Sequence, residues 1–238
     1  MTAGLPARLA MGAPRLSVGV LTADLGALND ELAVVAAEGV ELVHIDVMDG
    51  VFCPLLTMGA PIVAAMRTPM LKDVHLMVDE PLAKVTAFVA AGADMITFHL
   101  EGTRQPRRVL TSLAGAINAN DTERGVIRGV AITPSTPVAA IEPLLGDLEY
   151  VLILAVDPGW GGQSFAPSTV DRVAQARELI VASGRRILLG IDGGVTRTNV
   201  ADVLALGADI VVTGSAIFDG RAVAANARHM LAQAIAAR

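Results

Sequence analysis

Three segments of the chain follow one plan: "AEGVELVHIDV" at residues 37–47, "AAGADMITFHL" at 90–100 and "ALGADIVVTGS" at 205–215. Each begins with residues typical of a helix end, passes through a glycine and enters a short apolar run typical of a buried strand. Glycine suits that position because the chain leaves a helix through a left-handed backbone conformation that other residues rarely adopt. The repeat therefore predicts helix–strand units that follow one another along the chain.

The same alternation extends from Leu16 to the end of the chain. The apolar runs predict eight strands, near 16–21, 42–47, 73–77, 94–99, 128–132, 149–156, 186–191 and 208–213. Ala-rich segments of helical length lie between them, for example 28–39, 82–91, 167–183 and 196–206. Strands that alternate with helices in this way form right-handed βαβ units and a parallel sheet.

Eight such units in 238 residues favour a single α/β domain, a TIM (β/α)8 barrel over residues 15–238. We expect residues 1–14 to form a loose N-terminal extension. No segment has the composition of a linker to a second domain. An open, doubly wound sheet is the alternative. No G-x-G-x-x-G follows the first strand, however, so a dinucleotide site is not indicated.

The composition narrows the classes of partner. Hydrophobic residues make up 53% of the chain, yet its longest apolar stretch, near 203–218, is interrupted by Asp209, so we expect no membrane span. The formal net charge of −6 and the lack of a basic cluster in the sequence argue against nucleic-acid binding. The single cysteine, Cys53, excludes an internal disulfide, which fits a cytoplasmic protein.

Polar residues interrupt the apolar runs at three strand ends. His44 and Asp46 share one side of the second strand, His75 lies on the third and Asp192 ends the seventh. Taken singly, each could be a hydrogen-bonded core histidine or a turn aspartate. Together at one barrel mouth they predict a site for one divalent metal ion, since Zn, Fe, Mn and Co all accept imidazole and carboxylate ligands.

Glycine-rich loops follow the sixth, seventh and eighth strands. Backbone amides exposed in such loops bind phosphate, and many barrels hold a phosphate at the loops after strands seven and eight. Glycines can also merely permit tight turns, but three adjacent loops are poorly explained in that way. The predicted phosphate and substrate residues are Gly159, Trp160, Gly161, Gly162, Gly193, Gly194, Gly214 and Ser215, with His75 beside them.

Other candidates are weaker by themselves. Met48 and Met77 point to the same side as the predicted ligands, where they could be ordinary core residues or the floor of a pocket. His99 could line the site, but a hydrogen-bonded core histidine is the favoured interpretation. Cys53 lies in a loop without a partner that would make it a nucleophile.

Five segments in this order resemble the signature segments of the ribulose-phosphate 3-epimerase family, from about Ser17 to Phe218. They are "HIDVMDGVFCPLLTMG" (44–59), "DVHLMV" (73–78), "VDPGWGGQSF" (156–165), "IDGGV" (191–195) and "GADIVVTGSAIF" (207–218). The resemblance implies a metal held by His44, Asp46, His75 and Asp192, with Asp46 and Asp192 also the acid/base pair. It further implies a cytoplasmic homo-oligomer, a dimer or higher, acting on a ketose phosphate.

Three departures from that family pattern concern the substrate. The first strand reads "VGVLTAD", so Gly19 stands where the family usually has a serine. Val51 and Leu55 replace a histidine and an asparagine, and Leu154 replaces a methionine of the pocket floor otherwise formed by Met48 and Met77. The resemblance therefore implies the type of reaction, epimerisation of a ketose phosphate, more strongly than it implies the sugar. The expected conversion is D-ribulose 5-phosphate to D-xylulose 5-phosphate, and the alternative substrates are a tetrulose phosphate and allulose 6-phosphate.

The chemistry expected of this set is inversion at C3. One aspartate would remove a proton from one face, the other would return a proton to the opposite face, and a metal would stabilise the enediolate between these steps. A lyase or decarboxylase on the same barrel is the alternative enzyme class, but its Asp-x-Lys-x-x-Asp pattern is missing from "HIDVMD". A non-catalytic sugar-phosphate sensor would not need two costly buried carboxylates.

Overall fold

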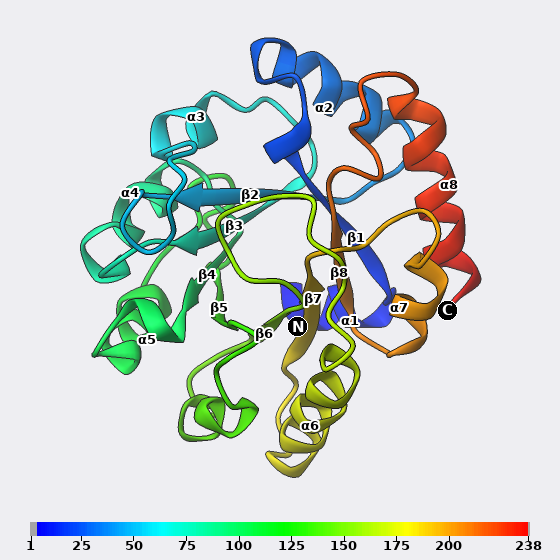
Figure 1. Ribbon diagram of the computed structural model, residues 1–238. Coiled ribbons are helices and arrows are strands. Elements are labelled where there is room, and N and C mark those ends of the chain that lie inside the picture. The colour runs from blue at the N-terminus through cyan, green and yellow to red at the C-terminus, as the bar shows by residue number, and fades with distance from the viewer. Residues whose placement is uncertain (1–3, 238) are drawn as a thin grey trace.

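The strands of the computed structural model, which describes residues 4–237, form a closed barrel (Figure 1). Every neighbouring pair is parallel, and β8 pairs with β1 to close the ring. The TIM (β/α)8 prediction is thus confirmed. The strands are β1 (Arg15–Gly19), β2 (Leu42–Met48), β3 (Leu71–Met77), β4 (Met95–His99), β5 (Ile127–Ile132), β6 (Tyr150–Leu154), β7 (Leu188–Asp192) and β8 (Ile210–Thr213).

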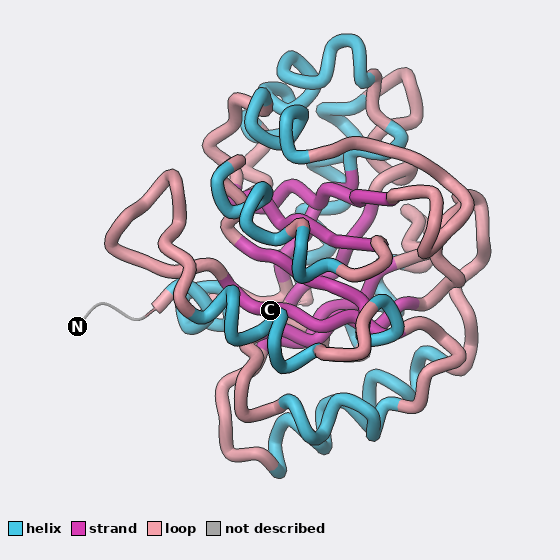
Figure 2. Tube along the Cα trace, turned by 90° about the vertical axis from the view of Figure 1, so that its left-hand side faces the viewer, coloured by secondary structure: helices cyan, strands magenta, loops and turns pink. Residues whose placement is uncertain are grey.

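Helices surround the strands on the outside (Figure 2). The α-helices are α1 (Leu5–Met11), α2 (Leu28–Ala37), α3 (Ala60–Ala65), α4 (Val85–Ala90), α5 (Pro106–Ala114), α6 (Thr169–Ala182), α7 (Val200–Ala205) and α8 (Val223–Ala236). Short 3-10 helices are η1 (Val20–Thr22), η2 (Leu25–Ala27), η3 (Pro81–Ala83), η4 (Leu100–Gly102) and η5 (Val138–Leu144). Between β5 and β6 only η5 covers the barrel; Pro143 lies inside it and lacks the N–H that a regular α-helix needs at that position.

The glycines of the repeated segments behave as predicted. Gly39, Gly92 and Gly207 follow helices α2, α4 and α7 and have φ angles of 95°, 86° and 78°. These angles lie in the left-handed region, which glycine enters without a steric penalty. Each helix therefore ends one short turn before the next strand begins.

Alternation along the strands creates two separate apolar regions. Val43, Ile45 and Val47 of β2 face outward and pack in the large core between strands and helices. Leu42 of the same strand faces inward, into a core that fills the lower part of the barrel. His44 and Asp46 share the inward direction with Leu42, because side chains of a strand alternate with period two. The barrel interior is therefore apolar at its N-terminal end and polar toward its C-terminal end.

Residues 5–11 do not form the loose extension that the sequence predicted. They fold as α1, and Leu5 and Leu9 are buried against the inward-facing core that includes Leu42 and Tyr150. Hydrophobicity explains the difference: without a cover, the apolar residues at the bottom of the barrel would be exposed to water. Residues 1–3 of the predicted extension lie outside the described residues.

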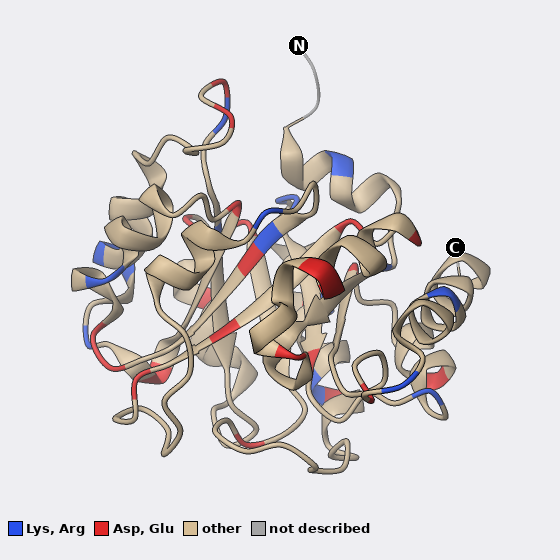
Figure 3. Cartoon of the chain, turned by 90° about the horizontal axis from the view of Figure 1, so that it is seen from above, with Lys and Arg blue, Asp and Glu red and all other residues tan. Residues whose placement is uncertain are grey.

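Lys and Arg, and likewise Asp and Glu, are scattered over many elements of the chain (Figure 3). Within residues 4–237, no helix is long and apolar enough to cross a membrane.

Truncation of Leu9 should show how much α1 contributes to the barrel. Leu9→Ala is expected to lower the free energy of unfolding by about 2–4 kcal/mol, the usual cost of a cavity at a buried leucine. Urea denaturation followed by circular dichroism measures the change. Met11→Ala in the same helix is the control, because Met11 is 72% exposed and its truncation should change stability little. Equal effects of the two substitutions would contradict the packing of α1.

Candidate functional site

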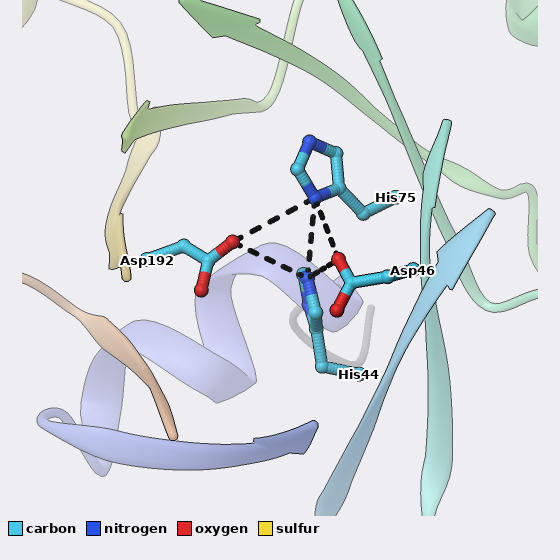
Figure 4. A group of neighbouring side chains, drawn as sticks. All are labelled: His44, Asp46, His75 and Asp192. Atoms are coloured by element: carbon cyan, nitrogen blue, oxygen red, sulfur yellow. Dashed lines mark hydrogen bonds and ion pairs between the residues drawn. The ribbon is translucent and has the colours of Figure 1, made fainter. Parts of the chain in front are cut away.

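Four polar side chains converge inside the C-terminal end of the barrel (Figure 4). His44 and Asp46 come from β2, His75 comes from β3 and Asp192 is the last residue of β7. Asp46 and His75 are directly opposite each other in the β2–β3 register. One donor atom from each of the four residues lies within 4.8 Å of the other three. The structure thus brings together the four residues that the sequence proposed as metal ligands.

The spacing of these donor atoms suits coordination of one small ion. Nε2 of His44 lies 3.2 Å from Oδ1 of Asp46 and 3.3 Å from Nδ1 of His75. Oδ2 of Asp192 lies 3.8 Å from Nε2 of His44 and 3.7 Å from Nδ1 of His75. Four ligands at roughly 2.1 Å from a shared ion in tetrahedral geometry are about 3.4 Å apart. The set is therefore a possible metal site, with two nitrogen and two oxygen ligands.

The hydrogen bonds behind His44 also fit a cation. Nδ1–H of His44 donates to the buried carboxylate of Asp73 at 2.8 Å, and the Ser17 hydroxyl donates to the same oxygen at 2.9 Å. This leaves a lone pair on Nε2, which faces the carboxylate of Asp46. Facing lone pairs repel one another unless a proton or a metal ion lies between them. A carboxylate behind a ligating histidine is a common arrangement in metal sites.

Burial and mutual contacts separate the pKa values of the two site carboxylates. Burial by itself would raise the pKa of Asp46, but contacts with His44 and His75 outweigh it and lower that pKa. Burial raises the pKa of Asp192, and the nearby charge of Asp46 raises it further against the attraction of His44. The protein alone therefore favours an ionised Asp46 beside a more readily protonated Asp192.

The pKa of His44 responds to the same charges. Burial lowers it, but the carboxylates of Asp73 and Asp46 together outweigh this effect, and the pKa is raised well above its usual value. A proton on His44 thus compensates the two carboxylates in the protein alone. A divalent ion bound at Nε2 would take over that role.

A cavity of about 430 Å³ opens above the four residues. Asp46 and Asp192 line it at the barrel end, beside Met48, Met77 and Leu154, so the predicted floor residues do reach it. His44 and His75 lie beneath this surface. All of the predicted glycine-loop residues line the other part: Gly159, Trp160, Gly161, Gly162, Gly193, Gly194, Gly214 and Ser215. Leu21, Ser164 and Phe165 also line it; they lie in quoted segments but were not singled out as site residues. Thr196 and Asn199 line it as well, and no quoted segment includes them.

Two of the glycines that line the cavity allow neighbouring backbone segments to pass close to one another. A Cβ atom on Gly194, whose φ is 67°, would lie 2.5 Å from the backbone nitrogen of Phe165. One on Gly214 would lie 2.9 Å from the carbonyl oxygen of Gly19. Among the described residues no Lys or Arg lines the cavity. An anion in this part would therefore have to be held by uncharged donors, such as peptide N–H groups, hydroxyls and side-chain amides.

The positions that depart from the family pattern differ in their relation to the cavity. Gly19 lines it next to Gly214, and a Cβ at Gly19 would have ordinary contacts, the nearest 3.6 Å from the Cα of Gly214. Val51 and Leu55 lie in the loop after β2, are 72% and 42% exposed, and do not line the cavity. Of these four positions, only Gly19 and Leu154 therefore line the cavity. Cys53 is buried against Met48 and Met77, as a packing residue.

His99 is a buried, hydrogen-bonded histidine, as the sequence favoured, and it does not line the cavity. Its Nε2 lies 2.9 Å from Nε2 of His75, on the side of that ring that points away from the cluster. His99 and Thr97 are two positions apart on β4, so the sequence indicates that they share one side of the strand. The contact between His99 and His75 depends in addition on the register of β3 and β4.

Solved structures with the same fold include an enzyme whose name refers to another sugar phosphate. The 3-hexulose-6-phosphate synthase from Salmonella typhimurium superposes with a TM-score of 0.65 at 17% identity and covers 94% of this chain and all of its own. KGPDC from Streptococcus mutans has a TM-score of 0.68 at 15% identity, covering 92% of this chain and 96% of that one. At such identities the similarity concerns the fold alone.

Sequence comparisons are more specific. The model of the ribulose-phosphate 3-epimerase family matches residues 15–218. The ribulose-phosphate 3-epimerase of Treponema pallidum (strain Nichols) is 38% identical over 207 residues, which cover 86% of this chain and 91% of that protein. The enzyme of the same name from Bacillus subtilis (strain 168) is 37% identical, covering 86% of this chain and 92% of its own. With its histidine–aspartate cluster and glycine-lined cavity in one barrel, the chain belongs to the ribulose-phosphate 3-epimerase family and is an isomerase.

Proposed function

We propose that the protein inverts C3 of a ketose phosphate, converting D-ribulose 5-phosphate to D-xylulose 5-phosphate. The observation that supports this most strongly is the placement of Asp46 and Asp192. They come from β2 and β7, approach the cluster from two sides and both line the cavity (Figure 4). Inversion of a carbon next to a ketone needs two acid/base groups, one on each face of the carbon.

The two carboxylates are suited to different roles. Asp46, whose pKa is lowered, would be the ionised group that removes the C3 proton. Burial raises the pKa of Asp192 in the protein without a metal ion, so Asp192 is the better proton donor of the two and would return a proton to the other face of the enediolate. In the reverse reaction the roles exchange. Separated protonation states in a carboxylate pair are how one site supplies both an acid and a base.

His44, Asp46, His75 and Asp192 would hold one divalent ion, for which their donor spacing is suited. Bound there, Zn, Fe, Mn or Co would supply Lewis-acid stabilisation of the negative charge that develops on the substrate oxygens. Asp73 holds the His44 ring with its free nitrogen toward the cluster.

The rest of the cavity would bind and shield the substrate. Met48, Met77 and Leu154 give the reacting end an apolar floor that limits water and proton exchange. The phosphate would lie in the glycine-lined part, against the backbone N–H groups of Gly193, Gly194, Gly214 and Ser215 and the loop Gly159–Gly162. Anchoring this remote end would position C3 between the carboxylates.

The identity of the sugar is the least constrained part of the proposal. Gly19 removes a hydroxyl next to Gly214, and Leu154 changes the floor, so a tetrulose phosphate or allulose 6-phosphate is the alternative substrate. In keeping with the family resemblance, we also propose that the protein is a cytoplasmic homo-oligomer, which sedimentation equilibrium and cell fractionation would test.

Substitution of the carboxylates should separate proton removal from inversion. Asp46→Asn and Asp192→Asn should each lower epimerisation by a factor on the order of 10²–10⁴ or more, because each removes one of two proton-transfer groups. The Asp192→Asn variant should still exchange the C3 hydrogen of one epimer with deuterated water without inverting it. Product analysis by NMR measures both reactions. Near-normal turnover in either variant would refute the two-carboxylate scheme.

A substrate screen should identify the sugar. Ketose phosphates of four, five and six carbons, incubated with the enzyme in deuterated water, are expected to show label at C3 of ribulose 5-phosphate first. Gly19→Ser is the matched variant, because a Cβ atom at this position would make only ordinary contacts. A change in the ranking of the sugars in this variant would assign Gly19 to specificity. Label in none of these compounds would count decisively against epimerisation.

Loss of one histidine ligand should release the metal. After dialysis, the purified protein is expected to retain about one ion per chain by elemental analysis, as one four-ligand site implies. His44→Ala and His75→Ala should lose most of it, whereas His229→Ala, at an exposed position of α8, should not. An unchanged metal content in both ligand variants would place the ion elsewhere.

A further inference from the structure

A chain of buried hydrogen bonds runs from the metal cluster toward the rim of the barrel through His75, His99 and Glu101. The Nε2 atoms of His75 and His99 are 2.9 Å apart, and their rings stack with centroids 5.0 Å apart at 29°. Nδ1 of His99 lies 3.2 Å from Oε2 of Glu101. Both imidazoles are fully buried, so these contacts are made without competition from bulk water.

Glu101 can only accept hydrogen bonds in this arrangement. Its Oε1 accepts from the backbone N–H of Thr133 at 2.8 Å, from the hydroxyl of Thr133 at 3.0 Å and from the hydroxyl of Thr136. Burial would raise the pKa of Glu101, but its bonds with His99, Thr136 and Thr133 outweigh this and lower the pKa to about 2. Glu101 is therefore an ionised acceptor for His99.

The direction of each hydrogen bond in the chain follows from Glu101, because Glu101 can only accept. With Glu101 as acceptor, Nδ1 of His99 carries the proton and Nε2 of His99 keeps a lone pair. That lone pair can only accept, so Nε2 of His75 donates to it. Nδ1 of His75 is then left with a lone pair directed at the cluster, 3.1 Å from Oδ1 of Asp46, where a metal ion needs it.

Surrounding residues hold the chain in place. The ring of Phe52 packs on His99, with centroids 4.7 Å apart. Arg172 of α6 donates to the carbonyl oxygens of Thr133 and Thr136, at 2.7 and 2.8 Å, and so fixes the loop that binds Glu101. This support spans β3, β4, the loop after β5 and α6, which is more than the burial of a single core histidine requires.

From this geometry we infer that Glu101 and His99 are positioning residues that set the tautomer of His75 and thereby present its Nδ1 to the metal. The inference rests on the metal site of the proposed function. The two histidine ligands would then be supported differently. His44 has the carboxylate of Asp73 directly behind it, whereas the neutral imidazole of His99 lies between His75 and the carboxylate of Glu101. Groups behind a ligating histidine typically change metal affinity 10–100-fold.

Glu101→Gln should reverse the donor and acceptor roles in every hydrogen bond from residue 101 to His75. The amide oxygen would still accept from Thr133, so the amide NH₂ would point to His99 and take the place of an acceptor. His99 would then carry its proton on Nε2 and donate it to His75, which would hold its own proton on Nδ1, in the path of a cation. Glu101→Asp keeps a carboxylate and should keep the original direction.

Two readouts test this without substrate. In metal-free protein labelled with ¹⁵N-histidine, Nε2 of His75 and Nδ1 of His99 should each carry a proton, and both of these protons should be missing in Glu101→Gln. Only four histidines contribute signals. A chelator-competition titration with Zn²⁺ should show roughly 10–100-fold weaker binding by Glu101→Gln. Glu123→Gln, at an exposed position, is the matched control and should bind like the parent.

A second variant covers the case in which Glu101→Gln does not fold. His99→Phe keeps an aromatic ring between Phe52 and His75 but removes the acceptor, and it should weaken Zn²⁺ binding to a similar degree. An unchanged His75 tautomer together with Zn²⁺ affinity within twofold of the parent in these variants would overturn the inference. If His75→Ala loses the metal while they do not, the metal site stands and the positioning role falls. If the parent binds no Zn²⁺, the proposed function fails, and the tautomer pattern still decides the role of Glu101 and His99.

Discussion

Closure of the barrel through the pairing of β8 with β1 is the constraint on which the site depends. β2 and β7 are far apart in the sequence, and in an open sheet the strands between them would separate Asp192 from His44 and Asp46. In the closed ring the inward-facing side chains of both strands meet across one interior. Because the strands are parallel, their C-terminal ends lie at the same end of the ring, and the loops that follow them surround the same cavity.

Because the barrel is closed, two chemically different regions lie around one cavity. At the strand ends, two carboxylates and two imidazoles stabilise one another where isolated charges would be costly to bury. In the loops after β6, β7 and β8 the cavity is lined by glycines together with hydroxyl, amide and apolar side chains, without a basic side chain among the described residues. In the proposed function, the first part would hold the metal ion beside the reacting carbon, and the second part would hold the phosphate of the substrate.

Period-two alternation is why so much of the site could be read before the structure was known. His44 and Asp46, or His75 and Met77, differ by two positions, so they share a side whatever the register of the strands. Glycine clusters at strand ends likewise predicted close approach of the backbone. The pattern was less informative where contacts depend on packing: the same apolar spacing gave no sign that residues 5–11 would close the barrel, and Val51 and Leu55 lie in an exposed loop outside the cavity.

The order of strands and helices, the inward direction of the polar residues and the family resemblance could all be predicted from the amino-acid sequence, because they depend on local periodicity and on residue type. Which donor atoms face one another depends instead on the three-dimensional fold. The contact between His75 and His99, the placement of Asp73 behind His44 and the acceptor role of Glu101 all require the register of neighbouring strands and the fold of the loop after β5. Hydrogen bonds are short and directional, so their partners follow from three-dimensional positions that no spacing along the chain specifies.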